Sequence, residues 1–180
     1  MKKKVIIFPG TLQSVKNYGD FAGVEIWMGE GWDGQIPEAD VYIGHSLGAS
    51  FALANCRKDA KLILFNPLVK KRSFFDNLWR WLRFTFFEGL PIKKVISVRF
   101  WFYTFRKMLN LLQVSVLDEL KKIPRENIFI IRGTQDYFFC DIETVEIIRK
   151  NNFNLIEVEA GHADWNESVA KIVADIVDKK

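Results

Sequence analysis

The sequence predicts an α/β fold with a doubly wound, mostly parallel six-stranded sheet and helices on both of its faces. Two observations support this prediction. Short runs of apolar or β-branched residues recur along the 180-residue chain, and such continuous runs are typical of parallel strands that are buried on both faces. Segments with apolar residues at helical spacing fall between several of these runs, and this alternation indicates the crossovers of an α/β sheet.

The expected elements follow one another without internal repeats. The six expected strands cover residues 5–8, 23–28, 41–44, 62–66, 128–132 and 155–159. Helical spacing is found over residues 47–57, 116–122, 142–150 and 166–177. Right-handed crossovers place the carboxyl ends of all parallel strands at one edge of the sheet, so the loops that follow the strands should meet there.

Length and composition favour a single domain over residues 1–180. A hydrophobic content of 49% is sufficient for a sizeable core. The chain has only two cysteines, Cys56 and Cys140, which excludes a disulfide framework and fits a reducing compartment. The apolar run after the first lysines ends at Pro9, too early for a signal peptide, and no run reaches the roughly 18 apolar residues of a membrane span. We therefore expect a cytoplasmic protein.

The segment 41–50, with the sequence V-Y-I-G-H-S-L-G-A-S, contains a G-x-S-x-G motif between an expected strand and an expected helix. In this context the serine lies at the tip of a tight turn, where the crowded backbone leaves room only for small neighbours. Gly44 and Gly48 meet that requirement. Ser46 is therefore the candidate nucleophile.

A serine nucleophile needs a base and an acid, which should also follow strands. The chain has two histidines. His45 precedes Ser46 directly and is expected to pack beside the turn, which leaves His162 as the base. Asp136, in the G-T-Q-D segment after an expected strand, is the favoured acid. Asp141 and Asp164 are nearby alternatives, because an aspartate in a loop is often a turn or cap residue.

The G-H-S-L-G motif and the chain order serine, acid, histidine resemble the α/β-hydrolase fold family. The resemblance implies that Ser46 is the nucleophile, Asp136 the acid and His162 the base, with no metal or organic cofactor. It also implies an oxyanion hole formed by the backbone N–H of Leu47 and a donor at Thr11. The usual leading pair of strands is missing and only residues 29–40 connect the second expected strand to the serine's strand, so the chain resembles a small, minimal member.

The composition changes abruptly after residue 67. Residues 68–112 hold twelve of the 26 aromatic residues, ten Lys or Arg and only two acids, so this segment carries about eight positive charges and the rest of the chain about four negative ones. The resembled family usually places its cap at this point. We expect a helical lid within residues 68–115, with helices over 73–87 and 92–112. The candidate substrate contacts in this lid are Trp79, Trp81, Phe86 and Trp101.

These features predict a serine carboxylesterase that acts on small-molecule esters of apolar acyl groups through an acyl-enzyme intermediate. Acyl thioesterase is an alternative, because it uses the same intermediate. A further alternative is a non-catalytic protein on the same fold that binds a partner or an anionic membrane through the basic, aromatic segment. Nucleic-acid binding is not expected, because no recognised motif accompanies the positive charge.

Overall fold

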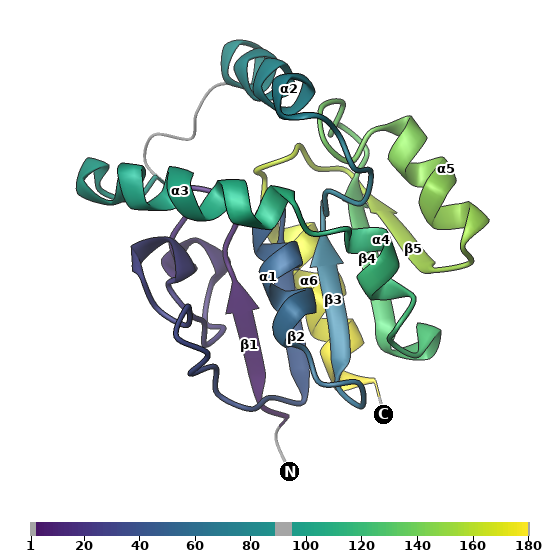
Figure 1. Ribbon diagram of the computed structural model, residues 1–180. Coiled ribbons are helices and arrows are strands. Elements are labelled where there is room, and N and C mark those ends of the chain that lie inside the picture. Colours follow the sequence, from purple (N-terminus) through teal and green to yellow (C-terminus); the bar gives the residue numbers. More distant parts are fainter. Residues whose placement is uncertain (1–2, 89–94, 180) are drawn as a thin grey trace.

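A parallel five-stranded sheet forms the centre of the computed structural model, which describes residues 3–88 and 95–179 (Figure 1). The strand order is the order in the chain. The strands are β1 (Val5–Phe8), β2 (Val41–His45), β3 (Lys61–Phe65), β4 (Ile128–Gly133) and β5 (Asn154–Val158). Successive side chains enter two different apolar clusters, Ile6 and Phe8 one and Ile7 the other, which explains why the strands have continuous apolar sequences.

Helices cover both faces of the sheet, as the sequence predicts. One face is covered by α1 (Leu47–Asn55), α4 (Val116–Leu120) and α5 (Ile142–Lys150), and the other by α6 (Glu167–Asp178). The side chain of Asn166 accepts a hydrogen bond from the N–H of Val169 and so starts α6. Val169, Val173 and Ile176 then bury one stripe of α6 against the sheet.

The prediction of a sixth strand over residues 23–28 is wrong. Gly23 makes only an isolated parallel bridge with Ile7, and the chain then turns into the short 3₁₀ helix η2 (Ile26–Met28). The carboxylate of Glu25 accepts hydrogen bonds from the side chain of Ser14 and from the N–H of Val15, just before and within the 3₁₀ helix η1 (Val15–Tyr18). These bonds tie the segment to η1 and not to a neighbouring strand.

Two longer helices lie across the carboxyl edge of the sheet, α2 (Phe74–Phe87) and α3 (Trp101–Leu112) (Figure 1). The helix expected over 73–87 begins one residue later, because Ser73 is its N-cap and accepts the N–H of Asp76. The helix expected over 92–112 is wrong over residues 95–100. Residues 92–94 lie outside the described residues, Val95 forms a bridge with Gln13, and the 3₁₀ helix η4 (Val98–Phe100) precedes α3.

The remaining short element is the 3₁₀ helix η5 (Arg125–Asn127), which leads into β4. Among the helices that the structure describes, none combines the length and the apolar character needed to cross a bilayer.

Candidate active site

Ser46 occupies the turn between β2 and α1, with φ 53° and ψ −122°, a conformation that non-glycine residues rarely adopt. Close packing forces this turn. A Cβ atom at Gly44 would lie 2.5 Å from the Cα of Ala49, and one at Gly48 would lie 2.4 Å from the carbonyl oxygen of Phe8. The two glycines therefore let α1 approach the sheet closely and leave Ser46 at the tip.

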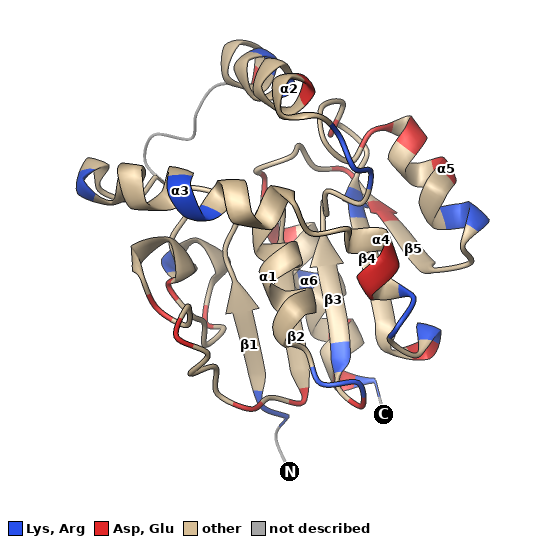
Figure 2. Cartoon of the chain, in the orientation of Figure 1, with Lys and Arg blue, Asp and Glu red and all other residues tan. Residues whose placement is uncertain are grey.

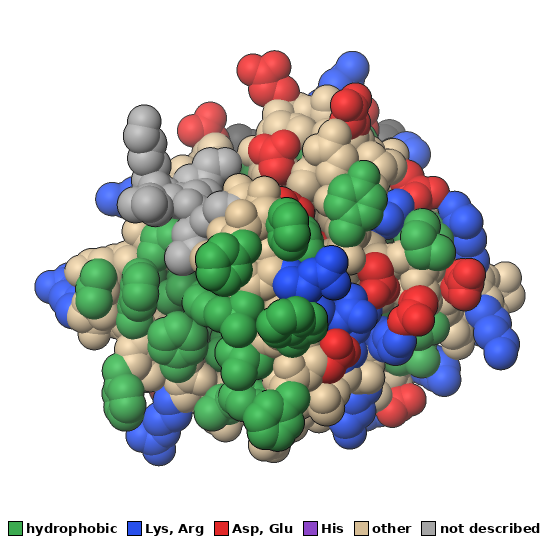
Figure 3. All heavy atoms as spheres, turned by 90° about the horizontal axis from the view of Figure 1, so that it is seen from above, with side chains coloured by type: hydrophobic (Ala, Val, Ile, Leu, Met, Phe, Trp, Pro, Cys, Tyr) green, Lys and Arg blue, Asp and Glu red, His purple; other side chains and the backbone are tan. Residues whose placement is uncertain are grey.

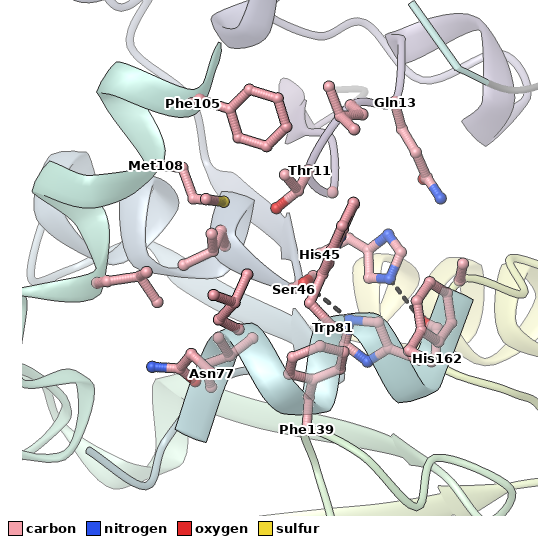
Figure 4. A pocket seen from close by; sticks show the side chains of 18 of the residues that line it. Thr11, Gln13, His45, Ser46, Asn77, Trp81, Phe105, Met108, Phe139 and His162 are labelled. Atoms are coloured by element: carbon pink, nitrogen blue, oxygen red, sulfur yellow. Dashed lines mark hydrogen bonds between the residues drawn. The ribbon is translucent and has the colours of Figure 1, made fainter. Parts of the chain in front are cut away.

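The structure brings Ser46, His162 and Asp136 together. The Oγ of Ser46 lies 2.9 Å from Nε2 of His162, as the dashed line in Figure 4 marks. On the other side of the ring, Nδ1 of His162 lies 2.6 Å from Oδ2 of Asp136. The three side chains are buried and follow β2, β5 and β4, at one edge of the sheet. This geometry lets the imidazole accept a proton from the hydroxyl while the carboxylate orients the ring.

The carboxylate of Asp136 is held in its ionised form. Its Oδ1 accepts the N–H groups of Phe138 and Phe139, and its Oδ2 accepts the N–H of Cys140. Burial acts to raise the pKa of this carboxyl group, but the charge and hydrogen bond of His162 and the backbone N–H groups outweigh it and hold the pKa at about 2.

The two alternative acids, Asp141 and Asp164, bind other partners. The carboxylate of Asp141 caps α5 and forms ion pairs at 2.9 Å with both Arg72 and Arg80. Asp164 accepts a hydrogen bond from the side chain of Asn166, just before α6. In the described part of the chain, Asp136 is the carboxylate that contacts the ring of His162.

Two residues that the sequence analysis missed position the backbone of His162. The side-chain amide of Asn66, directly after β3, donates to the carbonyl oxygens of Gly161 and His162 at 3.0 Å each and accepts the N–H of Gly133 at 2.7 Å. Glu88 accepts the N–H of His162 at 3.3 Å. The position of Asn66 after a buried strand was a usable signal, whereas nothing in the local sequence marks Glu88.

Aromatic rings enclose the imidazole of His162. The ring of Phe139 lies 4.5 Å from it and that of Phe84 lies 5.6 Å from it, between centroids. Phe84 comes from α2 and Phe139 from the loop after β4. These contacts restrict the access of water to the ring, which strengthens the electrostatic interactions around it.

The two expected oxyanion residues, Thr11 and Leu47, both line the cavity beside Ser46. The loop after β1 is fixed by two hydrogen bonds. Gly10 donates its N–H to the phenol oxygen of Tyr18 at 2.8 Å, and the indole of Trp27 donates to the carbonyl oxygen of Pro9 at 2.8 Å.

A cavity of about 260 Å³ lies next to Ser46, between the sheet edge and the two helices above it. Its walls are mostly apolar, with Trp81 of α2 and Phe105 and Met108 of α3 among the lining side chains (Figure 4). A cavity of this size and character suits an apolar group with a few polar atoms.

Of the four expected lid contacts, Trp81 lines this cavity and Trp79, Phe86 and Trp101 do not. Positions two and five residues from Trp81 point to another side of a helix, and Trp79 and Phe86 are accordingly exposed. The indole of Trp101 donates instead to the carbonyl oxygen of Ile96 at 3.2 Å and packs against the core.

Comparison with known proteins relates the fold to solved structures. No protein-family model and no curated protein sequence matches the chain. An N-formylmaleamic acid deformylase from Pseudomonas putida is similar in structure, with a TM-score of 0.58 and 14% identity over 97% of this chain and 92% of that one. A thioesterase domain from the curacin biosynthetic pathway gives a TM-score of 0.56 and 14% identity over 97% and 90% of the two chains.

A third similar structure, the Vlm2 thioesterase domain, has a TM-score of 0.51 and 16% identity over 98% of this chain and 91% of that one. At this level of identity the likeness concerns the fold. It extends over nearly the whole of each chain and agrees with the resemblance carried by the G-H-S-L-G motif. The chain therefore has the α/β-hydrolase fold.

Proposed function

We propose that this protein is a serine hydrolase, a carboxylesterase that cleaves small esters of apolar acyl groups. One observation carries the proposal. The hydroxyl of Ser46 lies within hydrogen-bond distance of His162, whose other ring nitrogen contacts the ionised carboxylate of Asp136. A nucleophile, a base and an orienting group in this arrangement are the requirements of acyl transfer through a covalent intermediate.

In the proposed first step, Nε2 of His162 accepts the proton of Ser46 as Oγ attacks the acyl carbonyl carbon. Asp136 accepts the Nδ1–H and stabilises the imidazolium that forms. When the tetrahedral intermediate collapses, the imidazolium gives its proton to the leaving alkoxide, and an acyl-serine remains. Water then repeats the sequence, with His162 as its base, and releases the carboxylic acid.

The tetrahedral intermediate carries a negative oxygen that needs N–H donors. The N–H of Leu47, at the first position of α1, is one proposed donor. The N–H of Gly10 is already bound to Tyr18, so the second proposed donor is the N–H of Thr11. Each donor of this kind contributes roughly 3 kcal/mol in related reactions.

The apolar cavity supports an apolar acyl group as the substrate part held next to Ser46. In this proposal residues 1–180 form a single domain. The lid of this domain lies within residues 68–115 and consists of α2 and α3. Cys56 and Cys140 are free thiols among the described residues, which supports a cytoplasmic location.

The proposal is tested with Ser46→Ala and an active-site-directed fluorophosphonate probe. We expect the probe to label the wild type and not the variant, and ester turnover to fall by roughly 10⁴- to 10⁶-fold. Ser50→Ala is the matched control, because Ser50 is a buried serine of α1, the helix that directly follows Ser46. Equal labelling or equal turnover in wild type and Ser46→Ala would exclude the proposal. Absence of both labelling and turnover in the wild type would favour a non-catalytic protein.

Acyl thioesterase is the second candidate, because two of the similar structures are thioesterase domains. The positive charge of residues 68–112 would also suit a phosphate-bearing thiol. Oxoester and thioester substrates with the same acyl chain separate the candidates. A higher kcat/KM for the oxoester supports carboxylesterase, and the opposite order supports thioesterase.

A further inference from the structure

Helix α2 carries a second apolar face that points away from the cavity. Phe75, Trp79 and Phe86 follow one another at spacings of four and seven residues, so they form one stripe along the helix. They are between 62 and 85% exposed, whereas Trp81 and Phe84 face the cavity. Among the described residues, the contacts of α2 with the rest of the protein come from its inner face, so the outer stripe needs a separate explanation.

The stripe belongs to a wider surface. Phe87 at the end of α2 and Phe102 of α3 are 75 and 83% exposed. Figure 3 shows hydrophobic side chains gathered on the face of the molecule that carries these two helices. We call the set the outer aromatic surface; its members are Phe75, Trp79, Phe86, Phe87 and Phe102. Monomeric proteins seldom expose large contiguous apolar patches without an interaction that uses them.

Exposed cations accompany the outer aromatic surface. Four of them are exposed: Arg83 of α2, Arg106 of α3, Lys71 before α2 and Arg99 of η4. In the described part of the chain no ion pair joins them to a carboxylate. On α2 and α3, Lys and Arg outnumber the acidic residues, while acidic residues are frequent on α4 and α5 (Figure 2).

Residues 68–112 contain two acids, Asp76 and Glu88, and neither forms an ion pair with these four cations. Asp76 pairs with Arg80 at 3.1 Å, and Glu88 is directed to the N–H of His162. Exposed aromatic rings beside unpaired cations are the combination that binds the interface of an anionic bilayer, because the rings enter the headgroup region and the cations attract the lipid phosphates. A surface that paired with a second copy of itself would instead bring these cations together.

We propose that the outer aromatic surface docks this protein onto an anionic lipid bilayer. The position of the cavity agrees with this orientation. Phe74 and Leu78 of α2 and Leu109 of α3 line the cavity and are also 50, 41 and 43% exposed, so the part of the cavity wall that the two helices form is partly open to solvent. If the proposed function holds, a docked molecule would receive its acyl substrate from the membrane.

The test uses Ser46→Ala protein and vesicles of phosphatidylcholine with or without phosphatidylglycerol, in a sedimentation assay at low and at tenfold higher salt. We expect binding to the anionic vesicles that weakens at the higher salt. Combining Phe75→Ser, Trp79→Ser and Phe86→Ser should lower the partition coefficient at least tenfold. When Ser46 is intact, the proteins with and without the three aromatic substitutions should hydrolyse a short soluble ester at the same rate. This measurement separates failure of docking from failure of the proposed function.

The charge contribution has a matched control. Arg83→Gln with Arg106→Gln should lower vesicle binding about tenfold or more. Lys121→Gln with Lys150→Gln removes the same charge after α4 and at the end of α5, and should leave binding unchanged. Absence of binding to anionic vesicles at low salt, or equal loss in both charge variants, would overturn the proposal. A dimer that the aromatic variant dissociates, without vesicle binding, would assign the surface to a second copy of the chain.

Discussion

The phenol oxygen of Tyr18 lies 2.6 Å from Nδ1 of His45, and both side chains are 1% exposed. The same phenol accepts the N–H of Gly10, while Nε2 of His45 donates to the carbonyl oxygen of His162 at 2.8 Å. A continuous set of hydrogen bonds therefore joins the loop after β1 to the loop after β5. His45 packs beside the serine turn, as expected, and also bridges the two loops that carry the proposed oxyanion donor and the proposed base.

Tyr18→Phe removes this bridge and keeps the ring. The N–H of Gly10 and Nδ1 of His45 would lose a partner in a buried site, where burial also raises the pKa of Tyr18 far above its usual range. We expect the free energy of unfolding to fall by about 2 kcal/mol, measured by urea denaturation. Ester turnover should fall roughly 10- to 100-fold, because small displacements of catalytic groups are costly.

The control for this prediction is Tyr137→Phe, which removes an exposed phenol. It should change neither stability nor turnover. Wild-type turnover in a correctly folded Tyr18→Phe variant would mean that the bridge does not position the two loops.

Asp136→Asn should lower ester turnover by about 10⁴-fold, because an amide favours the wrong tautomer of His162. Asp141→Asn is the informative comparison, since the sequence alone leaves Asp141 open as the acid. The structure places Asp141 in ion pairs with Arg72 and Arg80, so this variant should retain turnover within about tenfold of the wild type. Steady-state kinetics with a short ester measures the turnover of both variants. A larger loss of turnover in Asp141→Asn than in Asp136→Asn would make Asp141 the acid.

The carboxylate of Asp136 should also make stability depend on pH. Its pKa is lowered from 3.8 to about 2 by His162 and backbone N–H groups, against the effect of burial. A lowered pKa stabilises the fold at pH values above 3.8, and this contribution of about 2 kcal/mol is lost as the pH falls toward 2. In urea denaturation, the difference between wild type and Asp136→Asn should therefore shrink in that range. A difference independent of pH would contradict the ionised state.

Much of the site is accessible to sequence reasoning because parallel topology fixes where loops meet. Ser46, Asp136 and His162 each follow a strand, and the carboxyl ends of parallel strands share one edge. The continuous apolar runs were sufficient to find the five strands of the sheet. The same signal failed at residues 23–28, because the indole of Trp27 and the carboxylate of Glu25 bind Pro9 and Val15 in the preceding segments and not a neighbouring strand.

Side-chain pairing between distant segments is the part that the sequence does not reveal. Tyr18 and His45 are separated by 27 positions, and neither has a local pattern that predicts the other as its partner. The orientation of α2 is hidden for a different reason. Large aromatic residues lie on more than one side of it, so the sequence pattern did not exclude Trp79 and Phe86 from the cavity that Trp81 lines.

Trp81→Ala and Trp79→Ala form a pair that tests the inner and outer faces of α2. Trp81 lines the cavity and Trp79 is 62% exposed. With soluble nitrophenyl esters of increasing acyl length, Trp81→Ala should lower kcat/KM for the longer chains about tenfold more than for acetate. Trp79→Ala should leave the whole series unchanged. An equal effect of the two substitutions would contradict the placement of the acyl group beneath α2.

Gly48→Ala and Gly161→Ala test whether backbone crowding sets the position of the serine turn. At Gly48 the new Cβ would lie 2.4 Å from the carbonyl oxygens of Phe8 and Pro9, which belong to a strand end and its loop and have little freedom to move. We expect a loss of about 1–3 kcal/mol of stability and a clear loss of ester turnover, because α1 and the loop after β1 must separate.

At Gly161 the new Cβ would lie 3.0 Å from the carboxylate of Glu88, a flexible side chain that can move aside, and 3.9 Å from the Cβ of Asp164, an ordinary contact distance. Thermal unfolding and turnover of Gly161→Ala should therefore stay near those of the wild type, although the substitution lies beside His162. If Gly161→Ala were the more damaging of the two, the contact of Glu88 with the histidine loop would matter more than the approach of α1 to β1. Gly48→Ala crowds backbone atoms and Gly161→Ala crowds a side chain, both beside the candidate active site. Comparing the two variants therefore separates these two kinds of crowding.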